Sequence, residues 1–126
     1  MDIRKLFRSS LLWILVAPYG IFGLGVASNQ AVLMANHDAF PVMVNPVKLA
    51  GFLPDGVVIT PGQSQMIDTV HETMTKDTHL NALADIFDLG SIYSIGDFGI
   101  ILGMWLNTFA PVVWGTLVIK KLYDKE

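Results

Sequence analysis

The chain has 126 residues, of which 52% are hydrophobic and 15% are charged, and its formal net charge is −3. A soluble domain of this length carries about 25% charged residues, so the composition favours a membrane protein with room for one domain. The absence of cysteine excludes disulfides, thiolate metal sites and a cysteine nucleophile. The lysines are scattered and form no basic cluster of the kind that binds nucleic acid.

The first apolar segment follows a basic start. Residues 1–8 contain three basic side chains, and residues 9–27 carry no charge. A secretory signal shares this basic start, but its apolar core is only about 7–15 residues long. Here the core is longer, and apolar residues resume after Gln30. We therefore predict a retained transmembrane helix over residues 9–35.

The middle of the chain is polar and acidic. Prolines and glycines divide residues 36–94 into short pieces, so we predict short helices and loops outside the bilayer. A helix should start at Asn45-Pro46, with asparagine as the N-cap, and end near Gly51. Residues 57–60 are a β-like run that is too short to found a sheet.

Two amphipathic helical pieces are predicted later in the same segment, over residues 65–76 and 80–87. Both place apolar side chains at helical spacing, with polar side chains on the other face. Helices this short are not stable alone in water, so they should pack on each other, on the membrane surface or on a partner.

A metal site is one interpretation of the first amphipathic piece. Its candidate ligands are Asp68, His71, Glu72, His79 and Asp85. The zinc-protease motif is absent, because the position of its second histidine is Thr75. An ordinary solvated helix face explains the same spacing, and we prefer it. The sequence thus predicts no metal, no cofactor and no catalytic set.

The last apolar segment is the clearest feature of the chain. Residues 98–119 carry no formal charge and are followed by Lys120-Lys121, so we predict a transmembrane helix over residues 95–119. Asp97 lies in its first turn, where a carboxylate stabilises the positive end of the helix dipole. We interpret Asp97 as a structural cap; a proton or ion relay is the alternative role for an acid at this place.

Three further residues of this helix suggest how it packs. Gly99 and Gly103 form a small-xxx-small pair, which allows close approach of a second helix from the same chain or from another copy. Asn107 falls near the middle of the membrane, where an amide is costly without a partner, so it should face protein.

The charges also predict the orientation. Basic residues gather in residues 1–8 and in the tail, residues 120–126, and such flanks belong on the cytoplasmic side. The predicted fold is an all-α membrane protein: a two-helix transmembrane hairpin in the inner (plasma) membrane. Both termini would be cytoplasmic, and segment 36–94 would be extracytoplasmic.

Several short motifs resemble an uncharacterised family of small bacterial membrane proteins, a domain of unknown function. Its members carry N-G-G-x-M-P-V at the end of a membrane helix and S-h-G-D at the start of the last one. The first motif is similar to Asn36-His37-Asp38 followed by Phe40-Pro41-Val42, and the second to Ser94-Ile95-Gly96-Asp97. His37-Asp38 replace the glycine pair of the family.

The resemblance implies an architecture and key polar positions but no activity. It suggests that Asn36, Asp85 and Asp97 form one buried hydrogen-bonded cap that ties the outer segment to both helix ends. It also implies further membrane helices that this chain lacks, so that another chain would complete the bundle.

Three functions follow from these features. The first is a non-enzymatic accessory or structural subunit of a larger membrane assembly, with the lipid bilayer and other membrane subunits or further copies as partners. The second is a pore-forming or transport-related protein, including the phage holin type. The third is an extracytoplasmic metal-dependent activity that uses His71, Glu72 and His79.

Overall fold

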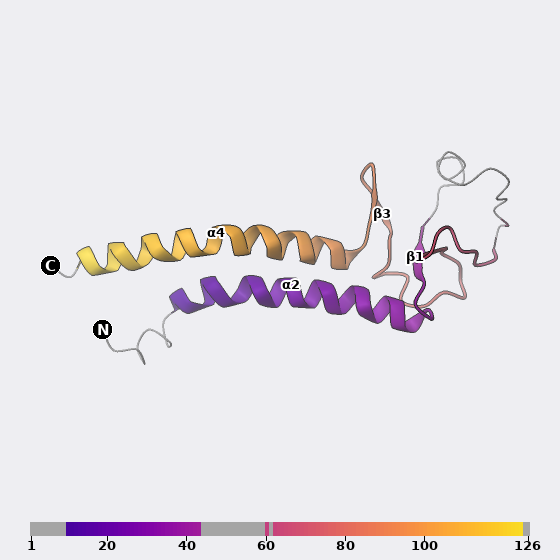
Figure 1. Cartoon of the computed structure of the whole chain (residues 1–126), viewed down its shortest axis with the longest axis horizontal. Helices are drawn as coiled ribbons and strands as arrows, with labels where there is room; N and C mark the ends of the chain where they lie inside the picture. The colour runs from indigo at the N-terminus through magenta and orange to yellow at the C-terminus, as the bar shows by residue number, and fades with distance from the viewer. Residues whose placement is uncertain (1–9, 44–59, 61, 125–126) are drawn as a thin grey trace. The chain divides into compact units, whose positions relative to one another are not determined.

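Two long helices carry most of the structure (Figure 1). The computed structural model describes residues 10–43, 60 and 62–124. These form two units, residues 10–26 with 98–124 and residues 27–97, which are described separately below. The predicted helix from Asn45 to Gly51 lies outside the described residues, as does the β-like run except for Thr60.

Helix α2 spans Ser10–Ala35 and helix α4 spans Ile95–Tyr123. Both long helices were predicted, and both are confirmed, with α4 extending past residue 119. Each contains one proline, Pro18 in α2 and Pro111 in α4. A proline has no N–H, so the Ile14 and Asn107 carbonyls each lack their usual helical donor.

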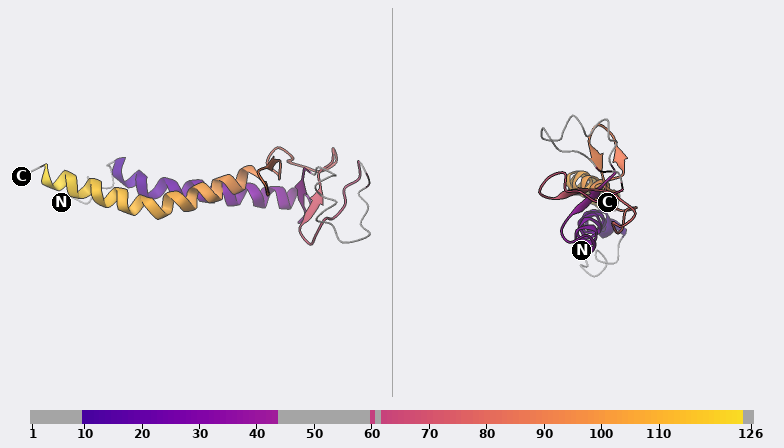
Figure 2. Two further views of the ribbon diagram at one scale, coloured as in Figure 1. Left: turned by 90° about the horizontal axis from the view of Figure 1, so that it is seen from above. Right: turned by 90° about the vertical axis from the view of Figure 1, so that its right-hand side faces the viewer.

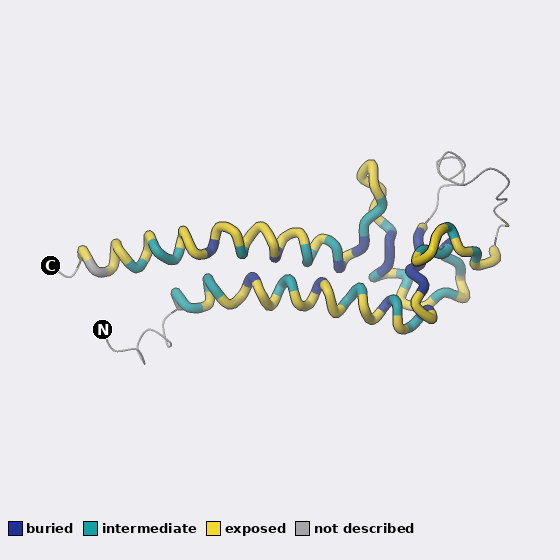
Figure 3. The backbone as a smooth tube through the Cα atoms, in the orientation of Figure 1, coloured by how far each residue is buried: buried dark blue, intermediate teal, exposed yellow. Residues whose placement is uncertain are grey.

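Each helix is buried along one narrow seam. The buried residues recur every seven positions, at Pro18, Gly25 and Val32 in α2 and at Gly96, Gly103 and Ala110 in α4. Half-buried residues lie between them, and the remaining surface is largely exposed (Figure 3). A repeat of seven residues is the pattern of two helices that pack as a coiled coil.

Glycines bring the two helices into close contact. A Cβ atom on Gly103 would lie 2.7 Å from the Cα of Phe22, and one on Gly99 would lie 3.0 Å from the Cα of Gly25. The order of these contacts along the chain makes residues 10–26 and 98–124 antiparallel, and they run alongside each other in Figures 1 and 2. Only glycine fits at these two positions of α4 without displacing the α2 backbone.

The second unit holds a short β ladder next to the end of α2. Strand β1 (Phe40–Val42) pairs in parallel with β2 (His71–Thr73), and Val42 also forms a parallel bridge with Asp85. All three residues of β1 are buried. Phe40 packs with Val32 and Ala84 in a small apolar core, so the ladder is anchored on the last turns of α2.

A second pair of strands precedes α4. Strand β3 (Phe87–Asp88) pairs antiparallel with β4 (Ile92–Tyr93), and Gly90 turns the chain between them with a φ of 93°. These short strands correct the all-α prediction for the polar middle of the chain.

The helix predicted over residues 65–76 is wrong. Asp68 Oδ1 accepts hydrogen bonds from the backbone N–H groups of Val70 and His71, both at 2.8 Å. Aspartate that bonds its own downstream backbone competes with the helix. The β-branched residues of this stretch also favour a strand, and the chain enters β2 instead.

The helix predicted over residues 80–87 is also wrong. Leu80 has a φ of 56°, which a right-handed helix does not accept. Asn81 Nδ2 donates to the Thr75 carbonyl at 2.8 Å and stabilises a turn before this point. The chain then continues through the bridge at Asp85 into β3.

The turn after α2 uses two residues in the left-handed region. His37 and Asp38 have φ values of 54° and 66°. These are the two positions where the family resemblance expects glycine, and a left-handed backbone is the conformation that glycine adopts without strain. In this chain the turn is therefore formed without the glycines that the resemblance expects.

Candidate functional site

The first polar site lies at the start of α4. Ser94 Oγ accepts a hydrogen bond from Asp97 N at 3.0 Å, while Asp97 Oδ2 accepts one from Ser94 N at 2.8 Å. This reciprocal arrangement is a capping box, with Ser94 as the N-cap and aspartate three residues later. Ser94 is fully buried, so the two bonds replace water at the end of the helix.

Asn29 of α2 completes this site. Its Nδ2 donates to Asp97 Oδ1 at 2.8 Å, and its Oδ1 accepts from Ser94 Oγ at 2.9 Å. Both carboxylate oxygens of Asp97 therefore have a donor, and the cap of α4 is joined to α2. Asn29 is not among the residues predicted for the cap, and its contact with Asp97 was not predicted.

Asn36 forms a separate site at the end of α2. Its Nδ2 donates to the carbonyls of Val32 and His79, both at 2.9 Å, and its Oδ1 accepts from His79 N at 2.7 Å. The side chain is buried and holds the backbone at residue 79 against the helix end.

The three residues expected in one cap are thus distributed over separate sites. Asp97 is bonded to Asn29 and Ser94, whereas Asn36 is bonded to the backbone of His79. Among the described residues, the contact found for the Asp85 carboxylate is with His71, at 4.0 Å from Nε2 to Oδ2. The ends of both helices are bonded to other residues of the second unit, but not through one network.

His71 lies between two carboxylates. Its Nδ1 is 2.8 Å from Asp68 Oδ2, and its Nε2 faces Asp85. Backbone hydrogen bonds from Val70 and His71, followed by the His71 side chain, lower the pKa of Asp68 to about 2. Burial, and then the negative charge of Asp97, raises the pKa of Asp85 to about 6, although His71 opposes this shift.

The other candidate metal ligands are held elsewhere. Glu72 accepts a hydrogen bond from the Ser64 hydroxyl, and His79 meets Asn36 through its backbone. In the part of the chain that the structure describes, no group of three or more histidine or acidic side chains is placed to hold a metal ion. His71, Glu72 and His79 are not brought together.

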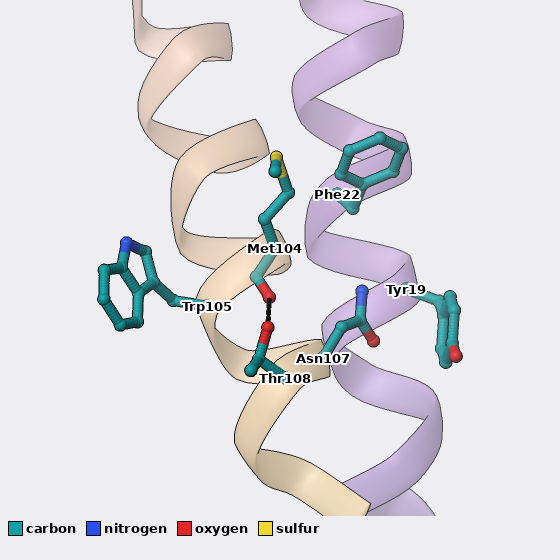
Figure 4. A pocket seen from close by; sticks show the side chains of 6 residues that line it. All are labelled: Tyr19, Phe22, Met104, Trp105, Asn107 and Thr108. Carbon is teal, nitrogen blue, oxygen red and sulfur yellow. Dashed lines mark hydrogen bonds between the residues drawn. The ribbon is translucent and has the colours of Figure 1, made fainter.

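A groove lies beside Asn107 on the helix pair. It has a volume of about 730 Å³ and is lined by Tyr19, Phe22, Met104, Trp105, Asn107 and Thr108. Figure 4 shows Asn107 between the two helices, whereas Trp105 points away from α2. Asn107 Oδ1 is buried and has no hydrogen-bond partner among the described residues, and the same holds for Trp114 Nε1 one heptad further on.

These features define a class of protein with two helices long and apolar enough to span a membrane, joined by a polar segment with short strands. The candidate spans are Leu11–Ala35 and Ile95–Lys121, with mean hydropathies of 1.8 and 1.5. Only 11% of each most apolar window is buried, unlike the core helix of a soluble protein.

The chain belongs to a family of unknown function, DUF5317, whose model matches residues 9–109. The expectation of an uncharacterised family is therefore confirmed. The match includes all of α2, the polar segment and about the first half of α4. No curated protein and no solved structure matches the chain.

Proposed function

We propose that this protein is a non-enzymatic accessory or structural subunit of a larger membrane complex. The observation that supports this proposal is the buried Asn107 amide oxygen, which has no hydrogen-bond partner among the described residues. The function would be to present the face of α4 beside the groove to another membrane helix.

The argument rests on the lack of hydrogen-bond donors in hydrocarbon. Asn107 lies near the middle of the span Ile95–Lys121, and lipid tails cannot satisfy an amide there. A donor on a neighbouring helix can do so, and such bonds contribute roughly 0.6–2 kcal/mol. The carbonyl that Pro111 leaves without a helical donor is that of Asn107 itself. A partner helix that packs into the groove would meet the Asn107 amide oxygen once this side chain turns toward it.

The surface around the groove also suits a protein partner. Trp105 and Phe109 stack with their ring centroids 5.7 Å apart, and both side chains are more than half exposed. Rigid aromatic side chains bury a large area when a partner covers them. Together with the Asn107 amide they would give the contact both area and a polar group that selects the partner.

Purification in mild detergent followed by native mass determination tests the proposal. We expect the full chain to co-purify with at least one different membrane protein in a defined ratio. Asn107→Leu should reduce the recovered partner several-fold, because it removes the acceptor and fills the groove.

Thr116→Val is the matched control. The Thr116 hydroxyl donates to the Val112 carbonyl of its own helix at 2.9 Å, so its loss should leave the partner in place. A stable lone monomer from native membranes would contradict the proposal, as would equal loss of partner in both variants.

A further inference from the structure

We propose that His71 and Asp85 form a proton-binding pair that fastens the β ladder at the end of α2 when the surrounding solution becomes acidic. This inference concerns the polar segment alone and does not depend on a partner chain. It stands on the place of the two side chains in the ladder, on their exposure and on the charges around them.

The pair spans strand β1, which begins five residues after α2 ends. His71 is paired with Phe40 on one side of β1, and Asp85 is bridged to Val42 on the other. The backbone of Asp85 also belongs to this ladder, because Asp85 N donates to the Pro41 carbonyl and Asp85 O accepts from Met43 N. An attraction between the two side chains would therefore hold both neighbours of β1 together.

The pair connects solvent to a buried carboxylate. The His71 side chain is 42% exposed, whereas that of Asp85 is 10% exposed. The rings of His71 and Phe40 pack in a T-shaped arrangement, with centroids 6.4 Å apart. The imidazole of His71 therefore lies between the solvent and the Asp85 carboxylate.

The charges facing the pair favour uptake of one proton. Asp85 faces His71 from β2 and Asp97 from the first turn of α4, and Asp68 lies on the far side of the imidazole. With a neutral imidazole the cluster holds three negative charges. One proton, on either His71 or Asp85, removes one of them. An imidazolium would donate from Nδ1 to Asp68 and from Nε2 to Asp85, and the present 4.0 Å gap to Asp85 would shorten to a hydrogen bond.

The sign of the pH dependence follows from Asp85. Its pKa in the folded chain is about 6, above the ordinary value of 3.8, so the folded state binds the proton more tightly than the unfolded state. This contribution to stability is present in full below the ordinary value and is lost as the pH rises through about 6. Acidification from neutral pH should therefore stabilise the β ladder.

Hydrogen–deuterium exchange of the full chain in nanodiscs measures this effect. The amides to follow are Met43 and Asp85, which donate across the ladder, and their rates are corrected for intrinsic exchange. We expect protection to rise roughly fourfold between about pH 7.5 and about pH 5.5, from the titration of Asp85. Asp85→Asn should show the same protection at both pH values. Equal protection of the wild type at both values would overturn the proposal.

A carboxyl ¹³C titration of the wild-type chain keeps the test independent of whether that variant folds. We expect a midpoint near 6 for Asp85, and an ordinary aspartate midpoint would overturn the proposal. His71→Gln should raise the Asp85 midpoint, because the charge that favours ionisation is lost, whereas His37→Gln should not change it. An unchanged midpoint in His71→Gln would show that the two residues do not act as a pair.

Discussion

Asp97 caps the start of α4 and also joins this end of the helix to α2. Its two carboxylate oxygens accept from different elements, Oδ2 from the backbone of Ser94 and Oδ1 from the side chain of Asn29. The negative charge also lies in the first turn of α4, where it complements the helix dipole. Each carboxylate oxygen therefore has a donor, which favours the structural role over a relay.

Asp97→Asn and Asp97→Leu introduce side chains of similar size that differ in hydrogen bonding. A comparison of the two variants therefore measures the contribution of the hydrogen bonds. Asp97→Asn keeps one acceptor oxygen, so the chain should retain much of its stability and accumulate in membranes. Asp97→Leu leaves Ser94 N and the Asn29 amide without their acceptor, which costs roughly 1–3 kcal/mol for a buried group. We expect Asp97→Leu to accumulate several-fold less, as measured by immunoblot of the membrane fraction.

Asp77→Asn is the control for charge alone, because Asp77 is exposed and its carboxylate makes no hydrogen bond to the residues that the structure describes. Its backbone N–H donates to the Thr75 hydroxyl. It should accumulate like the wild type. Normal accumulation of both Asp97 variants would mean that the cap does not stabilise the chain.

For single residues, the sequence indicated which polar side chains form hydrogen bonds better than it indicated the residues to which they bond. Ser94 and Asp97 are three apart, so a capping pair is local and readable from spacing. The bond from Asn29 to Asp97 joins residues 68 positions apart, and only the packing of two helices brings them together. The same limit explains why His71 and Asp85 were grouped as metal ligands rather than recognised as neighbours across β1.

Secondary structure was predictable where the pattern was long. Each long helix is a run of apolar residues with few charges, and that signal is strong. The strands have only two or three residues each, so no periodicity can develop within them. Their position depends on side-chain bonds such as those of Asp68 and on contacts with the end of α2, which a local pattern does not contain.

The close contact between α2 and α4 at Gly103 can be tested against a control substitution in the same helix. Gly103→Ala places a Cβ at 2.7 Å from the Phe22 backbone, so the helices must separate, at a cost of roughly 1–3 kcal/mol. Gly115→Ala places its Cβ within 4 Å of no described residue and should be neutral or slightly stabilising, since alanine favours a helix.

Unfolding by steric trapping in bicelles would measure both variants. The control makes the result specific, because both substitutions add the same methyl group to the same helix. If Gly103→Ala were as stable as Gly115→Ala, the close approach at Gly103 would not contribute to the fold.

At the scale of the whole molecule, the proposed topology follows from length and charge together. A helix of 26 residues is ~39 Å long, which exceeds a hydrocarbon core of ~30 Å. In the proposed topology, about 20 residues from Ser10 to Asn29 would span this core. The bond between Asn29 and Asp97 would then lie at the membrane boundary, where the polar segment begins.

The distribution of basic residues sets the direction. Six of the eight lysines and arginines lie in residues 1–8 and 120–126, and the polar segment between the helices is acidic. Basic flanks remain on the cytoplasmic side. We therefore expect residues near both termini inside the cell and the β ladder outside.

Single cysteines test this topology without background, because the chain contains none of its own. Asp77→Cys and Asp124→Cys replace two exposed aspartates, one in the polar segment and one after α4. In intact spheroplasts an impermeant maleimide should label the cysteine at position 77 directly and the one at position 124 only after lysis. Labelling at position 124 before lysis would reverse the orientation, and it would then expose the His71–Asp85 pair to cytoplasmic pH.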